Sequence, residues 1–214
     1  MVIVFDLDDT LYDEIDFVKS GFWAIASTFS NTPQKLFDFM WNLFLQEGSG
    51  SIFNQLIEYF HLDATLETLI TLYQTHTPNI TLPEETITLL KAIKGFGSTA
   101  LITDGLAQMQ IQKFNSLGLS AWIDYPVFTD LYNTCKPNPL AYKMVMEHFK
   151  DEIKFVYFSD NPKKDFFAPN DLNWLTVRYK NPYGIYREIP SNASYEITSR
   201  LTLIPIIQQY LSEK

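Results

Sequence analysis

Cysteine and histidine are scarce in this chain. Its 214 residues include one cysteine, Cys135, and three histidines. A single cysteine excludes an intramolecular disulfide and favours a reducing compartment, so we expect the protein in the cytoplasm. The histidines lie far apart and lack the spacing of metal ligands, so each is better interpreted as a surface or core residue than as a catalyst. With no histidine placed to activate it, Cys135 is interpreted as a packing residue.

Positive charge and long hydrophobic runs are also lacking. The chain has 16 Lys and Arg against 25 Asp and Glu, a net charge of −9. Nucleic acids and anionic membranes need a cationic surface, so neither is expected as a partner. No apolar run reaches the roughly 18 residues of a membrane span. The first strand pattern begins at residue 2, so we expect no signal peptide. A small phosphorylated metabolite stays compatible with this charge if local donors and a metal offset it, and the sequence indicates no oligomeric state.

Apolar residues, in contrast, are plentiful. They make up 46% of the chain, which includes 17 Phe and 12 Tyr. The length indicates one domain, or one domain with a large insertion. After Leu11, apolar residues recur at helical spacing, and Thr32-Pro33 is typical of a helix start. No strand pattern interrupts this stretch, so we predict an all-helical insertion over residues 13–79. Its helices are expected at 14–30, 33–46, 51–61 and 65–76.

Strand and helix patterns alternate in the rest of the chain, residues 1–12 and 80–214. Short apolar runs predict strands, and helical spacing between them predicts helices. This alternation is typical of an α/β core with a parallel sheet and helices on both faces. Strands are expected at 2–5, 98–103, 125–129, 155–159 and, as the last one, 175–178. Helices are expected at 83–94, 106–117, 139–149 and 197–211, the final one interrupted by Pro205.

Polar residues follow four of the predicted strands. The carboxyl ends of parallel strands lie on one edge of a sheet, so these side chains should converge on one site although they are distant in sequence. Each group alone could be an ordinary turn or a solvated loop. Their occurrence at four strand ends favours a site. The residues are Asp6, Asp8, Thr103, Asp104, Gly105, Lys136, Asp160 and Asp165.

These groups resemble the four motifs of the haloacid dehalogenase superfamily of aspartate-nucleophile phosphotransferases, over essentially the whole chain. The first motif matches Asp6-Leu7-Asp8-Asp9-Thr10-Leu11, and the second matches Leu101-Ile102-Thr103-Asp104-Gly105. The third matches Lys136 in Cys135-Lys136-Pro137, and the fourth matches residues 159–165. At Ser159 the family usually has glycine, and because serine is small we expect little consequence. The resemblance implies a Rossmann-like, three-layer α/β core.

The resemblance also implies a role for each residue in phosphoryl transfer. Asp6 would attack phosphorus and form an aspartyl-phosphate, and Asp8 would protonate the leaving oxygen and then activate water. We expect a neighbouring carboxylate to raise the pKa of Asp8, so that it carries a proton part of the time. Thr103 and Lys136 would complete the catalytic set. Phosphate oxygens would be held by Thr103, by the backbone N–H groups around Asp104 and Gly105, and by Lys136.

Four acids in one small site would repel one another without a cation. Mg²⁺ prefers oxygen ligands and needs few carboxylates, so it is the predicted cofactor. By the resemblance, its ligands are the side chains of Asp6 and Asp160 and the backbone carbonyl of Asp8. Asp165 would bind it directly or through water.

The helical insertion resembles the cap of the subfamily that includes phosphoglycolate phosphatase and β-phosphoglucomutase. Such caps close over the site and contact the leaving group. Specificity would then come from Asp13, Phe17, Ser20 and the loop 47–51, whose glycines permit unusual backbone angles. Most aromatic residues of the insertion, such as Trp41 and Phe44, are better explained as its core.

The expected function is a Mg²⁺-dependent phosphomonoester hydrolase that acts on a small organic phosphate. A sugar phosphate, a phosphoglycolate-like acid and a nucleoside monophosphate all fit. One alternative is a phosphomutase, which uses the same residues and returns the phosphoryl group to a sugar. Another is a catalytically idle binding subunit on this fold. Dehalogenases of the superfamily lack the second aspartate, so the presence of Asp8 favours phosphate over halide.

Overall fold

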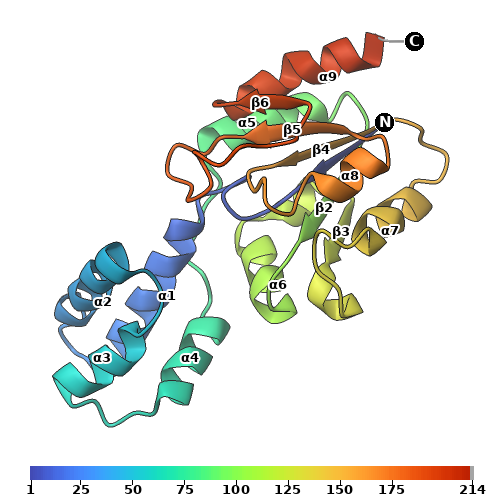
Figure 1. Ribbon diagram of the computed structural model, residues 1–214. Coiled ribbons are helices and arrows are strands. Elements are labelled where there is room, and N and C mark those ends of the chain that lie inside the picture. The colour runs from blue at the N-terminus through green and yellow to red at the C-terminus, as the bar shows by residue number, and fades with distance from the viewer. Residues whose placement is uncertain (213–214) are drawn as a thin grey trace. The chain divides into compact units, whose positions relative to one another are not determined.

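The computed structural model describes residues 1–212 and divides into two compact units (Figure 1). The first unit joins Met1–Asp13 to the segment that begins at Thr81, and the second is Glu14–Ile80. These junctions differ by one residue from those predicted from the sequence. None of the helices in the described part of the chain is long and apolar enough to cross a membrane.

A six-stranded parallel sheet forms the centre of the first unit, in the order β3-β2-β1-β4-β5-β6. The chain builds the sheet outward from β1 to β3 and then returns to place β4 on the other side of β1. Ligands of open α/β sheets bind at the carboxyl ends of the strands, beside such a switch point. The strands are β1 (Val2–Phe5), β2 (Ser98–Thr103), β3 (Tyr125–Phe128), β4 (Phe155–Ser159), β5 (Leu175–Tyr179) and β6 (Tyr195–Ile197).

Helices cover both faces of this sheet, which confirms the predicted α/β architecture (Figure 1). Side chains of α7 and α8 share one hydrophobic core with residues of β1, β2 and β3. On the opposite face, Phe114 of α6 meets Phe128 of β3 edge to face, with ring centroids 5.8 Å apart. Helix α9 packs against α5. The helices are α5 (Glu84–Ile93), α6 (Ala107–Ser116), α7 (Leu140–His148), α8 (Phe167–Asp171) and α9 (Leu203–Ser212).

The first strand is buried on both faces. Val2 and Val4 belong to the core beneath α7 and α8, and Ile3 and Phe5, which alternate with them, are also fully buried. Burial on both faces explains why β1 is a continuous apolar run instead of an alternating pattern. Since each such side chain contributes about 1.5–3 kcal/mol on burial, β1 is firmly held in the sheet.

The second unit is a bundle of four helices: α1 (Glu14–Phe29), α2 (Gln34–Glu47), α3 (Ile52–Phe60) and α4 (Leu66–Thr75). The structure describes all of residues 14–80, and this range contains no strand. The buried core of this unit is made by apolar residues from all four helices, and Trp41 and Phe44 pack against it. The core interpretation of these two aromatic residues is therefore confirmed. The Thr65 hydroxyl caps α4 by accepting a hydrogen bond from the Thr68 N–H group.

Three local predictions were wrong. The closing helix begins at Leu203 instead of residue 197, and Pro205 lies in its first turn, where a missing N–H group costs no helical hydrogen bond. Residues 195–197 form the edge strand β6, so β5 is not the last strand. The cap of α2 is Pro33 instead of Thr32. In addition, α8 and three short 3-10 helices, at residues 119–121, 129–132 and 200–202, were not predicted.

Candidate active site

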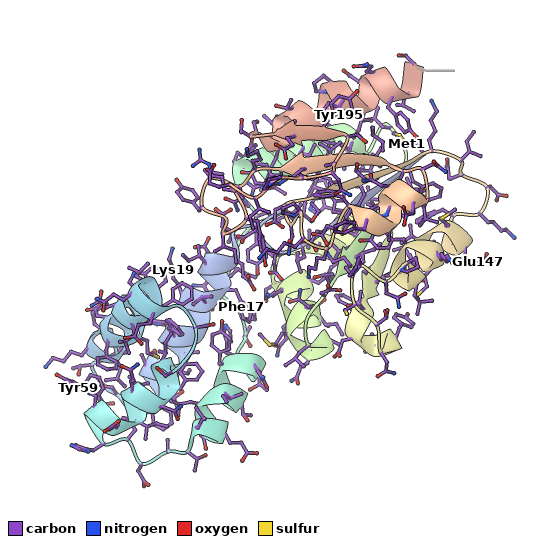
Figure 2. All side chains as sticks on the ribbon, in the orientation of Figure 1. Met1, Phe17, Lys19, Tyr59, Glu147 and Tyr195 are labelled. Carbon is purple, nitrogen blue, oxygen red and sulfur yellow. The ribbon has the colours of Figure 1, made fainter. Side chains whose placement is uncertain are left out.

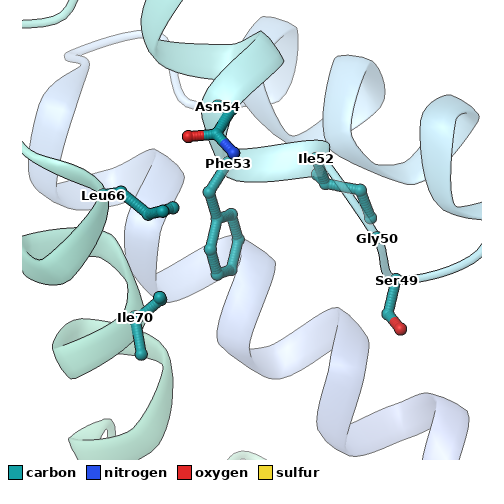
Figure 3. A pocket seen from close by; sticks show the side chains of 7 residues that line it. All are labelled: Ser49, Gly50, Ile52, Phe53, Asn54, Leu66 and Ile70. Atoms are coloured by element: carbon teal, nitrogen blue, oxygen red, sulfur yellow. The ribbon is translucent and has the colours of Figure 1, made fainter.

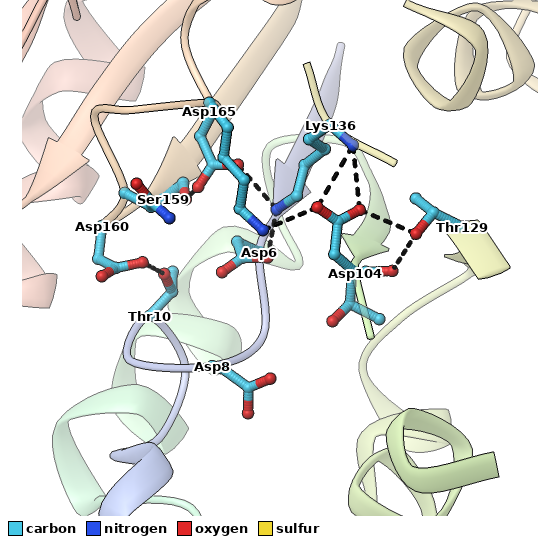
Figure 4. A network of polar contacts seen from close by, with 12 residues as sticks. Asp6, Asp8, Thr10, Asp104, Thr129, Lys136, Ser159, Asp160 and Asp165 are labelled. Carbon is cyan, nitrogen blue, oxygen red and sulfur yellow. Dashed lines mark hydrogen bonds and ion pairs between the residues drawn. The ribbon is translucent and has the colours of Figure 1, made fainter. Parts of the chain in front are cut away.

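The predicted site residues come together at the carboxyl edge of the sheet (Figure 4). Asp6 directly follows β1, Thr103 ends β2 and Asp160 directly follows β4. Lys136 lies in the loop between β3 and α7, and its peptide bond to Pro137 is cis. The convergence expected from a parallel sheet therefore places residues from four separate segments in one network.

Lys136 lies at the centre of this network. Its ammonium nitrogen is 2.6 Å from Asp6 Oδ1 and 2.9 Å from Asp165 Oδ1, and the side chain is 1% exposed. It also donates a hydrogen bond to the Tyr157 hydroxyl at 3.2 Å. Burial would lower the pKa of this ammonium, but Asp165 and Asp6 outweigh it and raise the pKa well above the ordinary value. Lys136 therefore remains a cation between two carboxylates.

Three buried carboxylates form a second feature of the site. One oxygen from each of Asp6, Asp160 and Asp165 lies within 4.8 Å of the others, which is compatible with a single shared cation. Asp160 Oδ1 accepts a hydrogen bond from the Thr10 hydroxyl, and Asp165 accepts one from Ser159. The Ser159 contact was not expected from the sequence, since we predicted little consequence from the departure from glycine.

Burial opposes ionisation of two of these carboxylates, Asp6 and Asp160. It raises the pKa of Asp6 to about 6, with Asp165 adding to the rise and Lys136 opposing it. Burial also raises the pKa of Asp160 to about 9, and the neighbouring charges of Asp6 and Asp165 contribute further. The cationic side chains of the site are thus insufficient to keep all the acids ionised at neutral pH. The donor set consists of hard oxygen atoms, so it fits a divalent cation such as Mg²⁺.

Asp104 is held by four donor contacts. Its carboxylate accepts hydrogen bonds from the Lys136 backbone N–H group at 3.1 and 3.3 Å and from the Thr129 hydroxyl at 2.8 Å. Lys164 pairs with it at 2.7 Å. Although burial raises the pKa of Asp104, the charge of Lys136 and the contacts from Lys164 and Thr129 outweigh it and bring the pKa below the ordinary value. Gly105 has a φ of +118°, a conformation that favours glycine. The turn at the end of β2 is therefore anchored to the Lys136 loop.

Asp8 lies apart from the cluster around Lys136 (Figure 4). Its Oδ1 accepts hydrogen bonds from the Tyr12 hydroxyl at 2.6 Å and from Lys113 at 2.8 Å, and its Oδ2 accepts one from Gln110 at 2.9 Å. Burial raises the pKa of Asp8, but the Lys113 charge and these hydrogen bonds bring it below the ordinary value. The prediction that a neighbouring carboxylate raises this pKa is wrong, because the neighbours of Asp8 are donors.

Several residues of the site were missed in the sequence. Gln110 and Lys113 are three residues apart on α6, a spacing that places both on one helix face just after the second motif, so they could have been noticed. Arg178 donates from its Nε to the Asp160 carbonyl at 3.2 Å, although nothing in its sequence context marks it. Thr129 and Lys164, the partners of Asp104, are also new. Cys135 is exposed, so its interpretation as a packing residue is wrong.

The residues predicted to set specificity already have partners within their own units. In the first unit, Asp13 Oδ1 accepts hydrogen bonds from Asn181 and Arg200, both at 3.2 Å. In the second, Phe17, labelled in Figure 2, is buried. The centroid of its ring lies 5.6 Å from that of Tyr73 and 4.9 Å from that of His76.

The other specificity candidates also belong to the second unit. The Ser20 hydroxyl accepts a hydrogen bond from the Asn79 N–H group at 2.8 Å. Ser49 and Gly50 of the loop 47–51 line a small pocket whose apolar wall includes Phe53, Leu66 and Ile70 (Figure 3). Their part in specificity stays a prediction.

The comparison with protein families decides the family of the chain. Residues 3–174 match the haloacid dehalogenase-like hydrolases. The chain belongs to this family. The predicted resemblance is therefore confirmed.

This haloacid dehalogenase-like hydrolase has curated relatives of similar length. It is 25% identical to a glyceraldehyde 3-phosphate phosphatase of Methanocaldococcus jannaschii, over 96% of each chain. It is 27% identical to a protein of the same name from Pyrococcus furiosus, over 97% of this chain and 93% of the relative. Among solved structures, a haloacid dehalogenase phosphatase from Thermococcus onnurineus superposes with a TM-score of 0.60 at 19% identity. That match covers 96% of this chain and 97% of the other, and it concerns the fold.

Proposed function

We propose that this protein is a phosphomonoester hydrolase that forms an aspartyl-phosphate on Asp6. The observation that carries the proposal is the buried pair of Asp6 and Lys136 at the end of β1, beside Asp160 and Asp165. Phosphoryl transfer requires a nucleophile and positive charge to balance the phosphoryl oxygens. A second acid, Asp8, is separate from the nucleophile, so it can move protons while Asp6 holds phosphorus.

The first half of the reaction transfers the phosphoryl group to the protein. An oxygen of Asp6 attacks phosphorus, the bond from phosphorus to the ester oxygen breaks, and Asp8 donates a proton to that oxygen, so the alcohol leaves neutral. Lys136, Thr103 and the backbone N–H groups at Asp104 and Gly105 stabilise the charge on the phosphoryl oxygens.

The second half returns the protein to its starting state. Asp8, now a carboxylate, accepts a proton from water, and the water oxygen attacks the phosphorus of the aspartyl-phosphate. The bond from phosphorus to Asp6 breaks, and inorganic phosphate leaves. Because Asp8 gives a proton in the first half and accepts one in the second, no other proton carrier is needed.

Asp6, Asp160 and the backbone carbonyl of Asp8 would hold Mg²⁺, with Asp165 binding directly or through water. The ion supplies positive charge that balances the phosphoryl oxygens and lets the carboxylates stay ionised together. The raised pKa values of Asp6 and Asp160 support this assignment, since a bound cation lowers both.

The substrate that we propose is a small sugar phosphate of the glyceraldehyde 3-phosphate type. Both curated relatives are named for this activity, at modest identity over nearly their whole lengths. The four-helix unit Glu14–Ile80 would act as the cap. The loop 47–51, whose Ser49 and Gly50 line a small pocket of this unit, is one candidate for specificity. We further propose a cytoplasmic location, with which the single, unpaired Cys135 is compatible.

Phosphate release tests the reaction. We expect the purified protein with Mg²⁺ to release inorganic phosphate from glyceraldehyde 3-phosphate and from several other small phosphomonoesters. Incubation of the protein with a 2-haloacid, followed by measurement of free halide, should show no halide release. Transfer of the phosphoryl group to a second sugar, with dependence on a bisphosphate activator, would instead indicate the phosphomutase. Failure to turn over any phosphomonoester, with the metal bound, would indicate the idle binding subunit.

Metal removal tests the cofactor. We expect EDTA to stop turnover and added Mg²⁺ to restore it. Mg²⁺ at about one hundred times its dissociation constant should stabilise the protein by about 2.7 kcal/mol, which thermal unfolding measures. D160N should lose this stabilisation. D151N removes an exposed carboxylate before β4 and should keep it. Full activity in EDTA, or equal stabilisation of D160N and wild type, would contradict the metal assignment.

A further inference from the structure

Helix α6 presents two buried polar side chains to Asp8. Gln110 and Lys113 are each 2% exposed, and their separation of three residues places them on the same face of the helix. Lys113 Nζ lies 2.8 Å from Asp8 Oδ1, and Gln110 Nε2 lies 2.9 Å from Asp8 Oδ2. Gln110 also donates to the Thr103 hydroxyl, so it joins Asp8 to the end of β2.

The contacts are distributed unequally over the two Asp8 oxygens. Oδ1 accepts from Lys113 and from the Tyr12 hydroxyl, the latter at 2.6 Å, whereas Oδ2 accepts from Gln110. A carboxylate oxygen offers about two acceptor directions, so Oδ1 is filled and Oδ2 is the oxygen with room for a further partner. Three donors on two oxygens also restrict rotation of the carboxylate.

Stability alone gives a weak reason for a lysine here. A buried ammonium loses its hydration, and replacing a buried ion pair by apolar side chains of similar volume is often neutral or stabilising. An apolar residue at position 113, together with an uncharged residue at position 8, would therefore stabilise the fold as much as the Lys113–Asp8 ion pair does. A charged lysine that contacts the acid of the reaction suggests a role in the reaction itself.

We propose that Lys113, assisted by Gln110, is a positioning residue that holds the Asp8 carboxyl group with Oδ2 toward the leaving oxygen of the substrate. This proposal rests on the proposed phosphatase function. In this role Lys113 acts through Asp8, which it contacts at 2.8 Å. Its removal should therefore affect the proton transfer to the leaving group and spare the capture of phosphorus by Asp6.

The dependence of activity on the leaving group separates these two steps. An alkyl phosphate needs a proton on its departing oxygen, whereas p-nitrophenyl phosphate has a leaving group that departs as a stable anion. The ratio kcat/KM reports the steps up to departure of the alcohol and leaves out the later hydrolysis of the aspartyl-phosphate. We therefore compare kcat/KM for the two substrates in each variant.

We expect K113M to lose about 100-fold in kcat/KM for the alkyl phosphate, the lower end of what general acid catalysis contributes. The loss with p-nitrophenyl phosphate should stay within about 5-fold, because that substrate makes little use of the acid. K113R should recover part of the loss with the alkyl phosphate. Q110M should show a smaller loss in kcat/KM, again larger for the alkyl phosphate than for p-nitrophenyl phosphate. It serves as the second variant if K113M does not fold.

K154M is the matched control. Lys154 precedes β4 at the opposite edge of the sheet and donates to the Tyr210 carbonyl at 2.7 Å, so its removal also deletes a partly buried ammonium. It should leave both kcat/KM values unchanged. Equal losses in kcat/KM for the two substrates in K113M and Q110M, or no loss in either variant, would overturn the positioning role. The phosphatase function would still stand in that case, provided that the wild-type protein hydrolyses the substrates. If the wild-type protein hydrolysed neither substrate, the proposed function itself would fail.

Discussion

Replacing Asp6 by asparagine should abolish turnover and leave the protein folded. Asp6 is the nucleophile in the proposed reaction, and asparagine has a similar shape but cannot form the aspartyl-phosphate. Loss of a nucleophile lowers kcat by about 10⁴-fold or more. The fold should persist because Lys136 keeps its second partner, Asp165 Oδ1 at 2.9 Å. Phosphate release and thermal unfolding of D6N measure the two effects.

The control for this prediction is D151N. Asp151 is an exposed carboxylate near the start of β4, at the edge of the sheet away from the site. The activity of D151N should therefore match that of wild type. Beryllium fluoride with Mg²⁺ mimics an aspartyl-phosphate, and it should raise the melting temperature of wild type and D151N but not of D6N. Turnover of D6N at a near wild-type rate would refute Asp6 as the nucleophile.

Replacing Lys136 by methionine should remove activity and also weaken the fold. Methionine fills a similar volume, but Asp6 and Asp165 are left as buried carboxylates without their common cation. Removing one partner of a buried ion pair typically costs about 3–5 kcal/mol. Urea unfolding of K136M measures this change, and phosphate release measures the loss of turnover.

The stability of K136M should also depend on pH. Burial is the largest influence on Asp6 and raises its pKa to about 6 even with Lys136 present, and without Lys136 the pKa rises further. A carboxylate with a raised pKa in the folded state binds protons more readily there than in the unfolded chain, so the stability of K136M should fall as pH rises above the pKa of the unfolded carboxyl. K136R, which keeps the charge, should lie between K136M and wild type. A K136M protein as stable at pH 8 as at pH 5 would contradict this account.

The core of the first unit was readable from the sequence because its strands are short apolar runs that end in polar residues. β1 is buried on both faces and therefore lacks alternation, and it is followed at once by Asp6. In a parallel sheet this order is enough to bring distant strand ends together, so the convergence of Asp6, Lys136 and Asp160 needed no knowledge of side-chain packing.

The side chains that contact the site residues could not be predicted from the sequence. Ion pairs such as Lys113 with Asp8, or Lys164 with Asp104, join segments far apart in sequence, and a lysine on a helix is most often a solvated residue. The pKa of Asp8 was predicted in the wrong direction because the nature of its neighbours depends on these contacts. The edge strand β6 has three residues, too few to show a periodic pattern, so a longer helix was predicted across it.

The central place of β1 has a consequence for the order of events during synthesis. β1 leaves the ribosome before both of its neighbours in the sheet, which are β2, at residues 98–103, and β4, at residues 155–159. Asp6, the proposed nucleophile, therefore follows an unpaired apolar strand until residues 155–159 have been made. The helices of residues 14–80 pack among themselves and need no such delay. Pairings between distant segments form slowly and leave apolar strands open to aggregation, so the nascent β1 is exposed to aggregation until β2 and β4 have been made.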